Sequence, residues 1–285
     1  METLVCKKAN KSLVKFILEE LGEVSYATVQ KLLRKKDIKL NGKRIKADTE
    51  VNVGDVVEIF GLTKNEREIP VLYQDKFLVV VNKPANIEVV TESGECLQSK
   101  VSKQIGQQCF AVHRIDRNTT GLVVFALDQQ TKEQLDESFK KHTIKKYYLA
   151  IVVGVPSKKS ERLVAYHKKD AKAAICYISD TEKPGYSQII TKYTLLKTND
   201  ILSLLEVEIE TGKTHQIRAH LAHIGLPLLG DEKYGDKQAN KQAKTKKQQL
   251  VAYKLKFSVR TNYKHNLALE QIELPNVKNE FLSTI

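Results

Sequence analysis

The chain has 285 residues, of which 41% are hydrophobic, and its 47 basic residues outnumber 34 acidic ones to leave a net charge of +13. This length is sufficient for one substantial domain and one small domain, and no apolar stretch reaches the roughly 18 residues of a membrane span. The first residues, METLVCKKANK, lack the apolar core of a secretory signal. We therefore expect a globular protein that stays in the cytoplasm.

The four cysteines are spread along the chain, without the spacing of a thiolate zinc site or the density of a disulfide framework. We therefore expect reduced thiols. The basic excess attracts polyanions and indicates RNA or DNA as the first candidate partner. A compositional bias toward Lys, Asn and Gln is an alternative source of this charge, so charge alone does not identify the partner.

The first predicted unit, residues 11–60, opens with two short amphipathic helices. Ser12 is placed to cap the first helix, which Gly22 ends, and Ser25 is placed to cap the second. Alternating polar and apolar residues after the second helix predict short strands that complete the unit.

Two tight turns separate these strands. Asn41-Gly42 is a strong signal for a two-residue hairpin, and Gly54-Asp55 precedes a further strand. Basic residues of the second helix and the hairpin form a cationic face suited to phosphate contacts, although an ordinary solvated surface is the alternative. The candidate RNA-binding residues on this face are Lys31, Arg34, Lys35, Lys43 and Arg44.

The segment GLTKNEREIP, residues 61–70, is polar and ends in proline, which is the composition of a linker. We therefore predict a small domain over residues 1–62, a linker over 63–70 and a larger domain over 71–285. Because the linker is short, phosphate binding by the first domain would raise the RNA concentration at the second.

The larger domain begins with a turn at Gln74-Asp75, a buried strand over residues 77–81 and a turn at Lys83-Pro84. A later apolar run over residues 122–127 is short enough for another buried strand. The polar loop HRIDRNTTG leads directly into this run.

Asp116 lies in this loop between Arg114 and Arg117, at the mouth of the predicted strand. The two positive charges favour an ionised carboxylate, which makes Asp116 a candidate nucleophile or base. A surface aspartate paired with arginine on an ordinary loop is the alternative.

Asp128 is placed to cap the helix that follows. Tyr147 and Tyr148 open the next strand and must point to opposite faces of the sheet, so only one of them faces a cleft. Cations at the end of a helix are favourable whatever the function, so the lysines there need no ligand to explain them. These lysines are Lys140, Lys141, Lys145 and Lys146.

Four successive strands joined by tight turns predict a largely antiparallel sheet rather than a doubly wound one. They cover residues 163–167, 173–178, 187–196 and 204–210. The basic segment 236–249 is predicted to be a loop or a helix extension that touches phosphates, and residues 250–259 form a closing strand.

A helix is predicted between Thr214, as its cap, and Gly225, which ends it. Arg218 borders the apolar side of this helix, from which its side chain can reach a cleft against the sheet. The apolar side carries Ile217, Leu221 and Ile224, whereas Gln216, His220 and His223 share a separate face.

Three segments resemble the RluA-type pseudouridine synthases, in the order of that family. HRIDRNTTGL (113–122) resembles the signature HRLD...TSGL, and KKYYLAIVVG (145–154) resembles the KxYxA strand. TGKTHQIRAHLAHIGLPLLGDEKYG (211–235) is similar to the third signature segment. NKPA (82–85) resembles a further family segment and makes Lys83 a weak candidate site residue. In the first unit, LNGKRI and VGDVVEI resemble an S4 RNA-binding domain.

The resemblance implies an α+β fold. The catalytic domain has a mostly antiparallel mixed β-sheet with flanking helices, and a small N-terminal α/β S4-like domain precedes it. The activity implied is an RNA pseudouridine synthase that isomerises uridines, most naturally in 23S ribosomal RNA, without a cofactor. The family's HQIR motif requires no metal, so we interpret His215, His220 and His223 as structural or RNA-facing and predict no metal site. A monomer is the default expectation.

The resemblance also assigns roles to residues. Asp116 matches the catalytic aspartate, and Arg218 matches an arginine beside it that holds the carboxylate ionised and oriented. Tyr148 matches the base-stacking tyrosine, and Arg114 matches a residue that helps to displace the target base or else clamps a phosphate. Whether the carboxylate attacks the sugar or promotes a glycal route stays open.

The chain departs from the family pattern at several positions, which are Ile87–Thr91, Ile115, Thr119-Thr120, Lys213 and Ala252-Tyr253. The changes at Ile115, Thr119-Thr120 and Lys213 remove no chemical role, and no site residue is assigned to the loop 87–91. The alternatives are tRNA as the substrate, or a non-catalytic RNA-binding or ribosome-assembly factor, which would lack Asp116 or Arg218. A metal-dependent nuclease is a third and weaker alternative.

Overall fold

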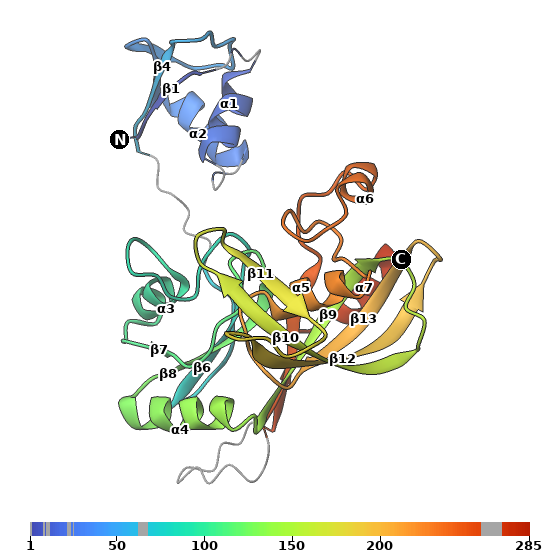
Figure 1. The fold of residues 1–285 in the computed structure, drawn as a ribbon. Coiled ribbons are helices and arrows are strands. Elements are labelled where there is room, and N and C mark those ends of the chain that lie inside the picture. The colour runs from blue at the N-terminus through green and yellow to red at the C-terminus, as the bar shows by residue number, and fades with distance from the viewer. Residues whose placement is uncertain are drawn as a thin grey trace. The chain divides into compact units, whose positions relative to one another are not determined.

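The computed structural model describes residues 2–7, 9, 12–21, 24, 26–61, 68–257 and 270–285. The chain divides into two compact units, Met1–Glu68 and Ile69–Ile285 (Figure 1). Each unit buries hydrophobic residues of its own, one cluster in the first and two in the second.

The first unit packs two helices against a small antiparallel sheet with the strand order β1-β4-β2-β3. Its elements are β1 (Glu2–Val5), α1 (Leu13–Leu21), α2 (Tyr26–Lys35), β2 (Ile38–Leu40), β3 (Lys43–Ile45) and β4 (Val56–Ile59).

Local signals in this unit were predictive. The backbone N–H of Lys15 donates to Ser12 Oγ at 3.1 Å, which confirms the first cap. The predicted signals at Gly22 and Ser25 lie outside the described residues. Asn41 and Gly42 both have positive φ between β2 and β3, so the two-residue hairpin is confirmed. The sequence did not predict β1, which forms only by pairing with the distant β4.

The second unit is built on one large mixed sheet with the order β11-β10-β12-β13-β9-β14-β8-β6-β5. Every pairing is antiparallel except that of β14 with β8, so the predicted mostly antiparallel α+β fold is confirmed. Two short strands lie off this path, since β15 pairs with β14 and β7 pairs with β8. The strands are β5 (Val71–Gln74), β6 (Leu78–Lys83), β7 (Phe110–Ala111), β8 (Thr120–Ala126), β9 (Ile144–Val153), β10 (Ser160–Asp170), β11 (Ile175–Ser179), β12 (Ser187–Thr198), β13 (Leu202–Ile209), β14 (Leu250–Phe257) and β15 (Gln271–Glu273).

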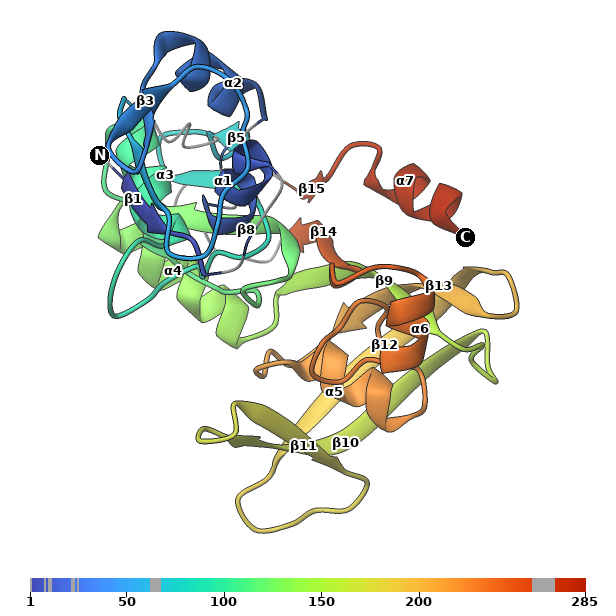
Figure 2. The same cartoon turned by 90° about the horizontal axis from the view of Figure 1, so that it is seen from above.

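Helices cover both faces of this sheet (Figure 2). α3 (Leu97–Ile105) and α5 (Gln216–His223) pack on one face, whereas α4 (Gln129–Lys140) and α7 (Val277–Thr284) pack on the other. The sequence did not predict α3 or α7. The basic segment after residue 236 contains a short separate helix, α6 (Lys237–Gln242), rather than an extension of α5.

Of two helix starts predicted from local signals, one is confirmed and the other was wrong. Asp128 accepts a hydrogen bond from the backbone N–H of Thr131 at 2.8 Å, as predicted for its cap of α4. The predicted cap of α5 was wrong, because His215 rather than Thr214 is the N-cap residue and it adopts a left-handed conformation with φ 52°.

Gly121 is located where the two halves of the sheet meet, in β8 between β6 and β14. Its φ is +116°, and an added Cβ would lie 2.2 Å from the carbonyl oxygen of Ala252 and 2.7 Å from its nitrogen. A Cβ atom at these distances would clash with the backbone of Ala252, so this close backbone approach requires glycine.

We predict that Gly121→Ala lowers the free energy of unfolding by roughly 3 kcal/mol or more, because Ala252 must shift within the sheet. Gly94→Ala is the matched control, since Gly94 also has positive φ but no atom within 4 Å of the added Cβ. The control is expected to lose only about 1 kcal/mol. Equal losses in urea denaturation would show that backbone conformation, and not the contact with Ala252, requires the glycine.

Candidate active site

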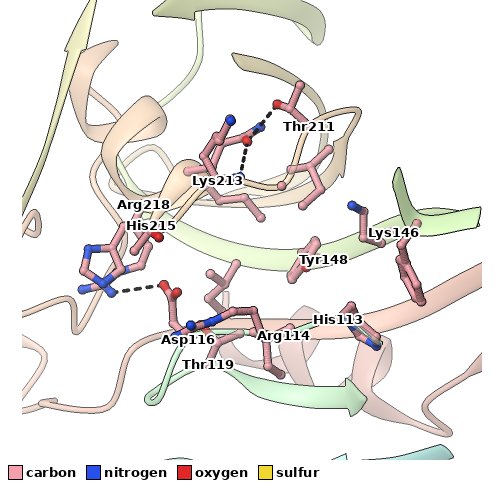
Figure 3. Close-up of a pocket in the computed structure, with 18 of the residues that line it drawn as sticks. His113, Arg114, Asp116, Thr119, Lys146, Tyr148, Thr211, Lys213, His215 and Arg218 are labelled. Atoms are coloured by element: carbon pink, nitrogen blue, oxygen red, sulfur yellow. Dashed lines mark hydrogen bonds and ion pairs between the residues drawn. The ribbon is translucent and has the colours of Figure 1, made fainter. Parts of the chain in front are cut away.

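A pocket of about 630 Å³ opens on the face of the sheet that carries α5 (Figure 3). Its walls come from the loop before β8, the start of β9, the end of β13 and the loop that leads into α5. The apolar side chains that line it include Ile115, Ile209, Ile217 and Leu250. The pocket therefore combines apolar surface with charged groups from segments that are far apart in the sequence.

Asp116 lies in the loop between β7 and β8 and lines this pocket. The turn that carries it is closed by a hydrogen bond from the N–H of Thr119 to the carbonyl oxygen of Asp116, at 3.0 Å. Gln248 Nε2 donates to Thr119 Oγ1 at 2.8 Å and ties the turn to the segment before β14. The side chain of Asp116 is 20% exposed, so it is accessible from the pocket but largely removed from water.

Arg218 contacts Asp116 in the pocket (Figure 3) and joins it to a second carboxylate, Asp231. Its Nη1 donates to Asp116 Oδ2 at 3.2 Å, while Nε and Nη2 donate to the two oxygens of Asp231 at 2.6 and 2.9 Å. Burial alone would lower the pKa of Arg218, but the hydrogen bonds and charge of Asp231, with those of Asp116, raise it. The guanidinium is therefore a fixed, buried positive charge beside Asp116.

The sequence suggested that Arg114 and Arg117, which flank Asp116, pair with its carboxylate, but the structure shows a different partner. The described contact to the Asp116 carboxylate comes from Arg218, whereas Arg117 is exposed and donates from Nε to the carbonyl of Asn86 at 3.3 Å. Arg114 is exposed at the rim of the pocket. Long-range pairing across 102 residues thus replaces the local pairing expected from the loop.

α5 is held in place by polar contacts on the face opposite Arg218. Gln216 Nε2 donates to the carbonyl of Ile190 at 3.0 Å, and His220 Nδ1 lies 3.0 Å from Thr191 Oγ1. Both side chains are buried, at 3% and 2% exposure, so the predicted polar face of this helix packs against β12. His220 is therefore structural and does not face RNA.

His215 also contributes to the pocket wall. Its Nδ1 lies 2.9 Å from the hydroxyl oxygen of Tyr234, which accepts a hydrogen bond from the N–H of Cys176 at 2.7 Å. Burial lowers the pKa of His215 to about 4, so the ring is neutral at pH 7. Tyr234 also places its ring 5.2 Å from the guanidinium carbon of Arg218. The left-handed backbone of His215 is thus supported by a polar network.

Tyr148 lies on the pocket side of β9 and is 6% exposed. Burial raises its pKa, with the charge of Asp116 acting in the same direction, so the phenol is neutral. Tyr147 lies on the other face, where Lys254 Nζ is 4.5 Å from its ring centroid. The prediction that the two tyrosines point to opposite faces is confirmed.

Comparison with known proteins identifies the family. The family model described as RNA pseudouridylate synthase matches residues 77–223, which contain the loop of Asp116, the strand of Tyr148 and the helix of Arg218. The chain belongs to the RNA pseudouridylate synthase family.

Individual relatives agree with this assignment. The chain is 28% identical to ribosomal large subunit pseudouridine synthase C of Vibrio parahaemolyticus, over 78% of this chain and 76% of that protein. It is 30% identical to an uncharacterized RNA pseudouridine synthase of Bacillus subtilis, over 85% and 86%. A solved structure of human RNA pseudouridylate synthase domain containing 4 is 25% identical, with a TM-score of 0.58 over 72% of this chain and 87% of that one.

Three residues of this synthase were missed or misread from the sequence. Asp231 lies eight residues beyond the family match and had no assigned role, although the GDEKYG segment was the signal. Lys83 received only a weak assignment from NKPA. Lys146 was placed at the end of a helix, but it lies within β9, is 9% exposed and lines the pocket.

Lys83 connects the loop after β6 to the loop of Asp116. Its Nζ donates to the carbonyl oxygens of Pro84 and Ile87 at 2.8 Å and of Arg117 at 2.9 Å, and the residue is fully buried. Burial lowers its pKa to about 8, although the charge of Asp116 opposes the shift. Lys83 is therefore a positioning residue for the Asp116 loop.

The basic residues predicted to bind RNA in the first unit are all exposed. They lie on α2 and β3 and comprise Lys31, Arg34, Lys35, Lys43 and Arg44. Arg44 Nη1 donates to the carbonyl of Lys36 at 3.2 Å, which places it at the junction of helix and hairpin.

Three further findings concern the described part of the chain only. No group of three or more His, Cys, Asp or Glu residues there is arranged to hold a metal ion. None of its helices is long and apolar enough to cross a membrane. The four cysteines are free and buried.

We predict that Asp231→Asn lowers the free energy of unfolding by roughly 3 kcal/mol, because it leaves the buried charge of Arg218 with a weaker partner. Asp180→Asn is the matched control, because Asp180 also pairs with a side chain of α5, His223, at 2.8 Å, but is 83% exposed. An exposed pair contributes at most about 1 kcal/mol. Similar losses for both variants in urea denaturation would contradict the anchoring role of Asp231.

We predict that Lys83→Met lowers the free energy of unfolding by about 2 kcal/mol, because the three hydrogen bonds that the buried Lys83 ammonium donates to carbonyls are lost. Lys76→Met, at an exposed position just before β6, is the control and should change stability by less than about 0.5 kcal/mol. Limited proteolysis should also cut the loop of Asp116 faster in the Lys83 variant alone. Unchanged stability and cleavage would remove Lys83 from the support of this loop.

Proposed function

We propose that this synthase converts specific uridines of large-subunit ribosomal RNA, 23S RNA, into pseudouridine. Relatives from Vibrio and Rickettsia that match more than three quarters of the chain are named ribosomal large subunit pseudouridine synthase C. The observation that carries the catalytic part of the proposal is the contact of Arg218 with Asp116 inside the pocket.

The features of the first unit favour a folded RNA, such as ribosomal RNA, as the substrate. Its two helices and basic hairpin fit the proposed S4-like domain over residues 1–62, followed by a linker over 63–70 and the catalytic domain over 71–285. The exposed basic residues of α2 and β3 would bind phosphates without reading sequence. Covalent attachment then raises the effective concentration of RNA at the catalytic domain.

The target uridine must leave its stack before it can enter the pocket. In this proposal Arg114, which is exposed and lines the pocket, helps to displace the base, and uracil stacks on the ring of Tyr148. Phosphate contacts and stacking offset the few kcal/mol that unstacking costs. The apolar lining of the pocket then excludes water from the reacting atoms.

Asp116 is the proposed catalytic residue. The bond between uracil N1 and ribose C1′ breaks, the base turns, and a new bond forms between C5 and C1′. The proton of C5 is lost and N1 gains one, so the product is an isomer of the substrate and no cofactor is consumed. The carboxylate either attacks C1′ or removes a sugar proton on a glycal route, and both need it ionised beside Arg218.

Two other functions remain as alternatives to be tested. tRNA is the alternative substrate, and mapping pseudouridines in ribosomal RNA and tRNA from cells with and without the gene distinguishes the two. A non-catalytic RNA-binding or ribosome-assembly factor needs neither the carboxylate nor its arginine, and this chain keeps both in contact.

We predict that Asp116→Asn reduces pseudouridine formation in transcribed 23S RNA by about a thousandfold or more, while RNA affinity stays within about threefold of wild type. The amide keeps the shape of the side chain but removes its charge. Asp200→Asn, in the exposed turn between β12 and β13, is the control and should retain full activity. Turnover by the Asp116 variant at a wild-type rate would refute the catalytic assignment.

A further inference from the structure

Lys146 is a buried charge in the pocket that the proposed reaction does not use. It is two residues from Tyr148 on β9, so both side chains point to the same face of the sheet. Lys146 is 9% exposed and lines the pocket. In the view of Figure 3, Tyr148 lies between Asp116 and Lys146.

The ammonium group of Lys146 has few partners. Its Nζ lies 6.0 Å from the centroid of the Phe139 ring, and a Cβ added to Gly212 would be 3.5 Å away. Across the described ranges, Nζ makes no hydrogen bond or ion pair, and because no fully buried side-chain nitrogen there lacks a partner, Nζ is reached by solvent from the pocket. Lys83 is a useful contrast, because it is fully buried and its ammonium group donates to three carbonyls.

A largely desolvated ammonium without a protein acceptor is unfavourable for the free protein. Burial accordingly lowers the pKa of Lys146. Several cationic or neutral groups line the same pocket, including Arg114, Lys140, His142 and Lys213, whereas Asp116 is the one carboxylate among the described lining residues. The part of the pocket around Lys146 is therefore suited to an anion, and an RNA substrate supplies phosphates.

We propose that Lys146 binds a backbone phosphate of the RNA at the target nucleotide while the base of that nucleotide stacks on Tyr148. This inference rests on the proposed function. The two Cα atoms are about 6.6 Å apart along a strand, which suits groups of the same or the adjacent nucleotide. Lys146 would thus position the flipped nucleotide relative to Asp116, and its ammonium would gain the acceptor that the free protein lacks.

The test compares the salt dependence of kcat/KM on 23S RNA for wild type, Lys146→Met, Lys146→Arg and Lys145→Met. Losing one phosphate contact should reduce the slope of log kcat/KM against log salt concentration by about 0.7. Lys146→Met is expected to show this change and a loss of about tenfold in kcat/KM, whereas Lys146→Arg should restore most of both. Lys145 is the matched control on the opposite face, 58% exposed and 3.8 Å from Glu208, and its variant should behave as wild type.

A second measurement separates binding from a structural role. Thermal unfolding of Lys146→Met should occur at the wild-type temperature or higher, because a largely desolvated charge without a protein partner is removed. The phosphate site would be overturned if Lys146→Met kept the wild-type slope of log kcat/KM against log salt concentration, or if a lowered unfolding temperature accounted for its lost activity. In either case, pseudouridine formation by the wild type would still uphold the proposed function. If wild type forms no pseudouridine in 23S RNA, the proposed function itself fails, and this site fails with it.

Discussion

The guanidinium of Arg218, placed between two carboxylates, is the interaction on which the rest of the site depends. Asp231 takes two of its donors and is fully buried, so the arginine has one orientation and presents Nη1 to Asp116. Burial would raise the pKa of Asp231, but Arg218 and the backbone N–H groups of Lys233 and Tyr234 lower it. The pair therefore stays ionised, and Asp116 meets a charge whose position is already set.

This constraint explains the structure around the segment 230–242. Asn240 of α6 accepts from the N–H of Gly230 at 2.7 Å and donates to the carbonyl of Asp231 at 3.2 Å. Gly230 has no room for a side chain, because an added Cβ would lie 2.1 Å from the carbonyl oxygen of Lys247. Through Asn240, α6 therefore fixes the turn at residues 230–231 and with it the position of Asp231. The two buried lysines differ in their partners. Lys83 donates to three carbonyls of the protein, whereas Lys146 has no protein acceptor and is proposed to bind a phosphate.

The sequence predicted what local rules control. The hairpin at Asn41-Gly42, the cap at Asp128 and the opposite orientations of Tyr147 and Tyr148 depend on neighbouring residues only, and each is confirmed. The antiparallel strands after residue 160 followed from alternation and tight turns. The family signatures then indicated Asp116, Arg218 and Tyr148, and the structure brings these three residues to one pocket.

What the sequence did not predict depends on contacts between distant segments. β1 forms only against β4, and the start of α5 is set by the network of His215 and Tyr234 rather than by a capping side chain. The anchoring of Arg218 by Asp231 and the burial of Lys146 follow from how loops pack on the sheet. Lys146 was assigned to the end of a helix from its position in the sequence, which carries no information on which face of β9 is covered.

The most direct measurement is a crystal structure of the Asp116→Asn variant bound to a 23S RNA fragment that contains its target uridine. The account predicts a uridine turned out of the RNA, with its ring on Tyr148, its C1′ beside residue 116 and Arg218 still bound to Asp231. A uridine that remains stacked in the RNA, with the pocket empty of any nucleotide, would contradict it.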